Sequence, residues 1–117
     1  MLLTKKEILK HRPMLHKDVH CPGLGGDIRV KALTTSERDL FEQRYQSIKE
    51  VEPGVTPNIR AYFIVHHAVD DKGELMFTVD DVVELGKQSP SDLDRVFTAC
   101  KDLSGFSDVD ITDLEKK

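Results

Sequence analysis

The sequence predicts an α+β fold, a mainly helical single domain with a small N-terminal β-hairpin. The chain has 117 residues, which is the usual size of one domain. Apolar residues beyond Leu33 recur mostly at spacings of three and four, as on one face of a helix. Asp27–Ala32 instead alternates polar and apolar residues, the period of a strand. We therefore expect one domain over residues 1–117, with residues 108–117 frayed.

The first 32 residues predict a short helix followed by the hairpin. Thr4 and Glu7 have capping-box spacing, so a helix begins at Thr4 and ends before Pro13. Residues 17–21 and 27–32 form the two strands. The glycine-rich segment 22–26 between them provides the turn.

A longer helix is predicted from Thr34 to about Lys49. Thr34 can cap the free N–H groups, and Glu37 lies three residues on, where its side chain reaches back. Leu40, Phe41, Tyr45 and Ile48 give this helix an apolar face. The polar segment 50–57, which contains Pro and Gly, predicts a loop.

Four further helices are predicted in the second half. One begins at Thr56-Pro57 and ends at the turn 70–73. Its apolar face contains Ile59, Tyr62, Phe63, His66 and Val69. A short helix runs from Thr78, with Asp81 at capping spacing, to Gly86. A long helix begins at Ser89-Pro90 and stops at Gly105, and residues 107–115 suit a final short helix because Ser107 precedes Asp110 at capping spacing.

The long helix carries an apolar stripe made of Leu93, Val96, Phe97, Cys100 and Leu103. The stripe is a candidate surface for a partner helix, as is the 50–57 loop. A place in the core is the favoured interpretation, because the chain has few other residues from which to build one. The partner-binding residues are therefore left unassigned.

Charge is distributed unevenly along the chain. Residues 1–50 carry 10 Lys/Arg and 7 Asp/Glu, a net of +3, and the remainder carries 7 and 14, a net of −7, which together give −4. A net negative charge argues against nucleic-acid binding. The asymmetry fits head-to-tail self-association or an acidic face offered to another protein. Ordinary solvated helix faces are the simpler explanation.

The acidic segment Asp70-Asp71-Lys72-Gly73-Glu74 has the appearance of a calcium-binding EF-hand loop. If Gly73 is the sixth position of that loop, its first and twelfth positions fall on Ala68 and Val79, which supply no side-chain oxygen. The fifth position is the cation Lys72. We interpret the segment as a reverse turn instead.

Metal, cofactor and catalytic sites are not predicted. His16, His20 and Cys21 are near one another but lack a fourth ligand at motif spacing, and the adjacent His66 and His67 point about 100° apart on a helix. The segment 23–26 lacks the Lys-Ser/Thr of a phosphate loop. No residue pattern places a nucleophile beside a base, so we expect a protein that is not an enzyme. We also expect no signal peptide and no membrane span.

A series of short motifs in fixed order gives the chain its clearest resemblance. In the first half they are Leu3-Thr4-Lys5, Gly25-Gly26, Val30-Lys31-Ala32-Leu33-Thr34, Glu37-Arg38-Asp39 and Phe41-Glu42. In the second half they are Asn58-Ile59-Arg60-Ala61, Val69-Asp70-Asp71-Lys72-Gly73, Phe77-Thr78 with Asp80-Asp81, Leu85-Gly86-Lys87, Leu93-Asp94-Arg95-Val96-Phe97 and Leu103-Ser104-Gly105. In this order the chain resembles the phage tail assembly chaperones of long-tailed, non-contractile (siphovirus-type) phages and their prophages. The His66-His67 pair departs from that pattern, where small or aliphatic residues are expected.

The resemblance implies a viral assembly factor that acts in the host cell cytoplasm. Such chaperones bind the tape measure protein, keep it soluble, recruit major tail tube subunits, and are absent from the mature virion. From the residues themselves we expect no cofactor and no nucleic-acid or membrane partner. The alternative is a small head-tail or tail component that stays in the virion, and a calcium sensor is a weaker one.

Overall fold

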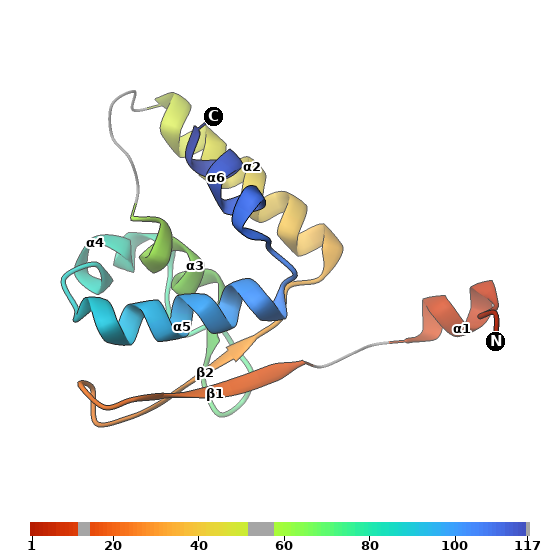
Figure 1. Cartoon of the computed structure of the whole chain (residues 1–117), viewed down its shortest axis with the longest axis horizontal. Coiled ribbons are helices and arrows are strands. Elements are labelled where there is room, and N and C mark those ends of the chain that lie inside the picture. Colours follow the sequence, from red (N-terminus) through yellow and green to blue (C-terminus); the bar gives the residue numbers. More distant parts are fainter. Residues whose placement is uncertain (12–14, 52–57, 117) are drawn as a thin grey trace.

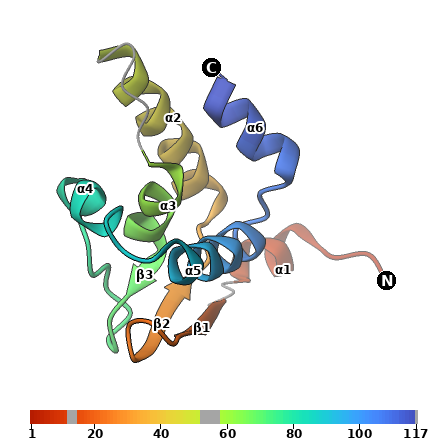
Figure 2. The same ribbon diagram turned by 60° about the vertical axis from the view of Figure 1, so that its left-hand side comes forward.

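The protein consists of a small antiparallel sheet, helices on one face of that sheet, and two helices whose far ends extend from the body (Figures 1 and 2). The computed structural model describes residues 1–11, 15–51 and 58–116. In chain order the elements are α1 (Lys5–Lys10), β1 (His16–Cys21), β2 (Gly26–Lys31), α2 (Thr35–Val51), α3 (Ile59–His67), β3 (Ala68–Val69), the 3-10 turn η1 (Val79–Asp81), α4 (Val82–Leu85), α5 (Pro90–Leu103) and α6 (Asp108–Lys116). The predicted α+β class is confirmed.

The predicted hairpin is present as β1 and β2, which pair in register from His16 opposite Lys31 to Cys21 opposite Gly26. Gly25 in the turn has a φ of 79°, a left-handed conformation that suits glycine. A third strand, β3, pairs with β2 and places Ala68 opposite Val30. The helix predicted before the turn continued through these residues, which was wrong, because α3 ends at His67 and the chain then joins the sheet.

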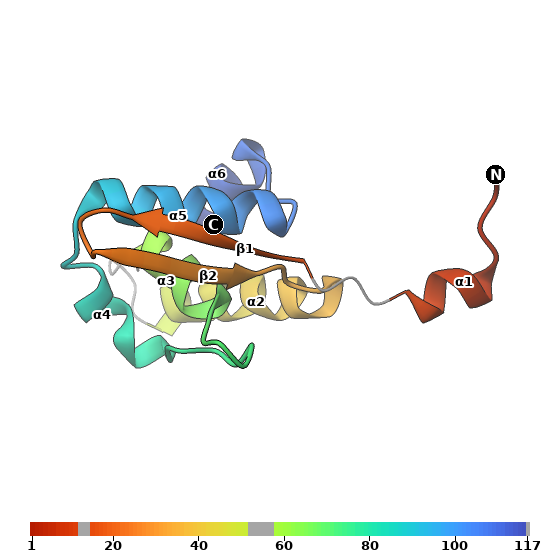
Figure 3. The same cartoon turned by 90° about the horizontal axis from the view of Figure 1, so that it is seen from below.

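Helices α3 and α5 pack on one face of the sheet, and Figure 3 shows both strands of the hairpin in front of them. Helix α3 is buried on every side from Ala61 to Val65, which is the pattern of a helix inside a core rather than at its surface. Only one apolar face was predicted for this helix. Its surroundings explain the difference, since α3 contacts α5, β2 and the short 79–85 segment.

Aromatic rings from separate elements fill the centre of the core. Phe41 of α2 lies with its ring centroid 4.7 Å from that of Phe63, 4.9 Å from that of Tyr62 and 5.7 Å from that of Phe106. Edge-on and tilted pairs at these separations add to the energy of apolar burial. Phe41 therefore joins α2 both to α3 and to the segment between α5 and α6.

Several predicted helix boundaries are confirmed, and others differ from the observed ones. The Thr4–Glu7 and Ser107–Asp110 capping pairs are present, and α6 is helical over most of the segment predicted to fray. The predicted start at Thr56-Pro57 lies outside the described residues. Helix α3 is capped at Asn58 instead, whose side-chain oxygen accepts a hydrogen bond from the N–H of Ala61 at 3.1 Å. Helix α2 continues to Val51, into the segment predicted as a loop.

No helix among the described residues is both long and apolar enough to span a bilayer. Helix α1 has no buried residue, and Figures 1 and 3 show it apart from the packed body.

Candidate functional site

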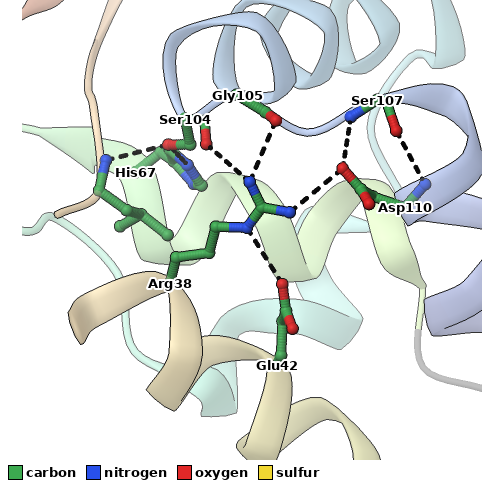
Figure 4. A network of polar contacts seen from close by, with 8 residues as sticks. Arg38, Glu42, His67, Ser104, Gly105, Ser107 and Asp110 are labelled. Carbon is green, nitrogen blue, oxygen red and sulfur yellow. Dashed lines mark hydrogen bonds and ion pairs between the residues drawn. The ribbon is translucent and has the colours of Figure 1, made fainter. Parts of the chain in front are cut away.

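The most highly connected polar cluster surrounds Arg38, where α2 meets the segment that joins α5 to α6 (Figure 4). The guanidinium donates from Nε to Glu42 at 3.1 Å, from Nη1 to the carbonyl of Gly105 at 3.0 Å, and from Nη2 to Asp110 at 3.1 Å. Its Cζ also lies 4.0 Å from the centroid of the Phe106 ring. The planar fork of arginine suits this set of partners. One side chain thus fixes the direction in which α6 leaves the body.

The acceptor Asp110 is itself held in place by the start of α6. Its carboxylate accepts the N–H of Ser107 at 2.9 Å, and its own N–H donates to the Ser107 hydroxyl at 3.1 Å. The hydrogen bond from the Ser107 N–H is the largest cause that lowers the pKa of Asp110 below its usual value. Asp110 therefore stays ionised opposite Arg38 at neutral pH.

A second group of hydrogen bonds adjoins the first and is centred on Ser104. The Nδ1 of His67 lies 2.7 Å from the carbonyl oxygen of Phe63, and its Nε2 lies 2.8 Å from the Ser104 Oγ. Because a carbonyl only accepts, Nδ1 carries the proton and Nε2 accepts from the hydroxyl. The same Oγ accepts the N–H of Leu33 at 2.9 Å. These bonds join α3, the end of α5 and the segment that leads into α2.

Burial keeps this histidine neutral. His67 has no solvent-exposed surface, and desolvation lowers its pKa to about 4. The contact with Ser104 has the length of a nucleophile–base pair, but the ring has no solvent-exposed surface, and its Nδ1 donates to a main-chain carbonyl rather than to a carboxylate. Ser104 also holds the Leu33 amide. We interpret the pair as a structural hydrogen bond.

A groove separates the extended parts of α2 and α6. The cavity measures about 580 Å³ and is lined mainly by polar side chains, namely Arg38, Glu42, Gln43, Gln46, Ser47, Asp110, Asp113 and Leu114. One hydrogen bond crosses near its far end, from Gln46 Nε2 to the carbonyl of Leu114 at 3.3 Å. The Arg38 cluster closes the near end, so it also sets how far apart the two helices stand.

The apolar stripe of α5 belongs to the core, which confirms the favoured interpretation. Leu93, Val96 and Cys100 are buried, and Phe97 and Leu103 are half-buried against the same cluster. Burial also raises the pKa of the Cys100 thiol, which leaves it protonated. The other candidate surface, the 50–57 loop, lies mostly outside the described residues.

The acidic turn is confirmed as a reverse turn. The Asp70 carboxylate accepts hydrogen bonds from the N–H groups of Lys72 at 2.8 Å and of Glu74 at 3.1 Å. Gly73 has a φ of 83°, which this turn requires. The first carboxylate of the supposed calcium loop is thus already used by the turn.

The other candidate ligands are dispersed. His16 and His20 are exposed, whereas Cys21 is buried on the opposite face of β1. The His20 Nδ1 lies 2.9 Å from an Asp27 oxygen. Among the described residues, no group of three or more His, Cys, Asp or Glu side chains is arranged to hold a metal. His66 is half-buried at the edge of the core, as expected, and its ring packs against Phe41.

Sequence reasoning missed the roles of Arg38, His67 and Ser104. Arg38 and Glu42 have the spacing of an i,i+4 ion pair, which was an available signal. The sequence carries no comparable signal for His67 and Ser104, because their hydrogen bond joins residues that are 37 positions apart.

Comparison with known proteins shows which solved structure this fold is similar to. No protein-family model matches the chain, and no curated protein matches it in sequence. Among solved structures, the chain is similar to the bacteriophage HK97 tail assembly chaperone, with a TM-score of 0.52 and 17% sequence identity. The match covers 88% of this chain and 95% of that one. The chain therefore has the fold of a phage tail assembly chaperone, in agreement with the resemblance seen in its motifs.

Proposed function

We propose that the chain is a phage tail assembly chaperone. It binds the tape measure protein in the host cytoplasm, keeps that protein soluble, recruits major tail tube subunits, and leaves before the virion is complete. The likeness of fold to the HK97 chaperone, over nearly the full length of both chains, is the observation that carries the proposal. The ordered motifs of the sequence support it independently of the fold.

The character of the surface is compatible with the same proposal. Large apolar side chains remain exposed at separate places, among them Leu2, Ile8, Leu40, Met76, Val83 and Val109. They are surrounded by charged residues, which form 32% of the chain. Singly exposed apolar side chains are common on soluble proteins, so they agree with the proposal but do not carry it. This role needs no catalytic chemistry and no cofactor, and we propose none.

The direct test is co-expression with the tape measure gene of the same phage or prophage. We expect the tape measure protein to move from the pellet to the soluble fraction and to co-purify with a tagged copy of this chain. Co-expression with an unrelated soluble protein of the same size is the control. A tape measure protein that stays insoluble, or is soluble but does not co-purify, contradicts the proposal.

A further inference from the structure

Two exposed surfaces of this chain have complementary chemistry. The first, the N-terminal arm, comprises residues 1–11 and includes α1. The second, the acidic strip, comprises residues 74–84, which connect β3 to α4. Neither belongs to the Arg38 cluster or to the groove between α2 and α6.

The arm is apolar and basic. Leu2, Leu3 and Ile8 are 95%, 61% and 56% exposed. Lys5, Lys6 and Lys10 against Glu7 give residues 1–11 a net charge of +2. Within the described residues these lysines form no ion pair, and the Glu7 carboxylate is used to cap Thr4. The arm thus offers unpaired positive charge beside exposed apolar side chains.

The strip is apolar and acidic. Leu75, Met76, Val79 and Val83 are 47%, 55%, 44% and 71% exposed. Val79 and Val83 are four residues apart on consecutive helical turns and so share a face. Glu74, Asp80, Asp81 and Glu84, with no basic residue among them, give residues 74–84 a net charge of −4. Across the described parts of the chain, Glu74 and Asp80 have no ion-pair partner.

We infer that the arm of one copy docks on the acidic strip of a second copy of this chain. The two surfaces are opposite in sign of charge, and both expose large apolar side chains. Every residue of the arm is exposed, and the arm projects away from the body in Figures 1 and 3. Burying exposed Leu, Ile, Met and Val side chains against one another supplies the driving force. The unpaired charges set the orientation and weaken the contact as salt rises.

The geometry of such a contact has a consequence for the assembly. The arm and the strip are different surfaces, so the interface is heterologous, and every added copy leaves one arm and one strip free. Association therefore continues past the dimer as concentration rises. The few side chains involved place it among weak interfaces.

Sedimentation velocity of the full chain, from low micromolar to near-millimolar concentration, tests the inference. We expect the wild type to shift to larger species with concentration and to return towards monomer in high salt. Leu3→Gln/Ile8→Gln in the arm and Met76→Gln/Val83→Gln in the strip should each weaken association at least about tenfold, the loss of roughly 1.4 kcal/mol. Val109→Gln, at a site 68% exposed on α6, is the matched control and should associate as the wild type does.

Mixing the two double variants separates contact between copies from an arm that folds onto its own body. Each variant alone retains one intact surface, so the mixture should form a one-to-one complex that grows no further. A wild type that stays monomeric, a variant that associates normally, or a mixture that stays monomeric overturns the inference. The measurement uses this chain alone, so its outcome is independent of tape measure binding.

Discussion

The Nε2 of His67 lies 2.8 Å from the Oγ of Ser104, and this hydrogen bond ties the last turn of α3 to the end of α5. Beside it, Arg38 ties α2 to the start of α6 (Figure 4). Both sets of bonds converge on residues 104–110. This short segment therefore determines how α2 and α6 are held relative to the core.

Acid should destabilise the fold through His67. Its pKa falls from 6.5 to about 4 on folding, so the unfolded chain takes up a proton first as the pH drops. The contribution of neutral His67 to the free energy of unfolding is fully present above pH 6.5. It falls by about 3 kcal/mol between pH 6.5 and 4 and does not change further below pH 4. His66 adds a loss of the same sign, because desolvation also lowers its pKa. Urea unfolding at a series of pH values measures the effect.

His67→Gln provides the comparison for that titration. The variant should be less stable than the wild type at pH 7.5, and its stability should vary less between pH 6.5 and 4. Equal slopes for the two proteins over this range would show that His67 is not the titrating group.

Ser104→Ala should cost about 1–3 kcal/mol, because the Leu33 N–H loses its acceptor and the His67 Nε2 loses its donor. Ser91→Ala is the matched control, since its hydroxyl meets only Ser89 on the exposed start of α5. It should change stability by less than about 0.5 kcal/mol. Thermal and urea unfolding compare the pair, and equal losses for both would rule out the role given to Ser104.

Arg38→Lys should loosen α6 while keeping the positive charge. A lysine has no planar fork and cannot serve Glu42, Gly105 and Asp110 together. Amide hydrogen exchange within residues 108–116 should become faster by roughly tenfold or more, while α3 keeps its protection. Arg44→Lys, at an exposed site on the same helix, should leave α6 unchanged. Unaltered protection of α6 in Arg38→Lys is the result that would disprove the prediction.

Gly23→Ala should disturb the contact between the hairpin turn and α5. A Cβ at this position would overlap the Oδ2 of Asp92, a buried carboxylate whose Oδ1 accepts the Gly23 N–H at 3.4 Å. We expect a loss of about 1–3 kcal/mol, the usual cost of overpacking. Gly26→Ala, where a Cβ meets nothing within 4 Å, should be near neutral. Urea unfolding measures the change in the free energy of unfolding for both variants. A Gly23→Ala variant as stable as the wild type would contradict the close packing.

Features encoded by neighbouring residues were predictable from the sequence. The capping pairs Thr4–Glu7, Thr34–Glu37 and Ser107–Asp110 mark helix starts, and each pair makes the expected hydrogen bonds. The period of two in β2 and the glycines before it indicated the hairpin for the same reason.

Features that depend on distant residues were not predictable. Ala68 and Val69 form a strand only because β2 is beside them, and two residues carry no recognisable period. His67 lies off the face predicted to be apolar and becomes buried because α3 is surrounded on all sides. Ser104 was interpreted only as part of a helix end, since its partners Leu33 and His67 are far away in sequence.

We propose that this chain assists tail assembly and then leaves. Quantitative mass spectrometry tests it most directly, applied to tape measure protein captured from cells during tail assembly and to purified virions of the same phage. We predict that the chain is abundant in the captured complex and absent from the virions. Its presence in virions at a stoichiometry like that of other tail proteins, or its absence from the captured complex, would contradict the account.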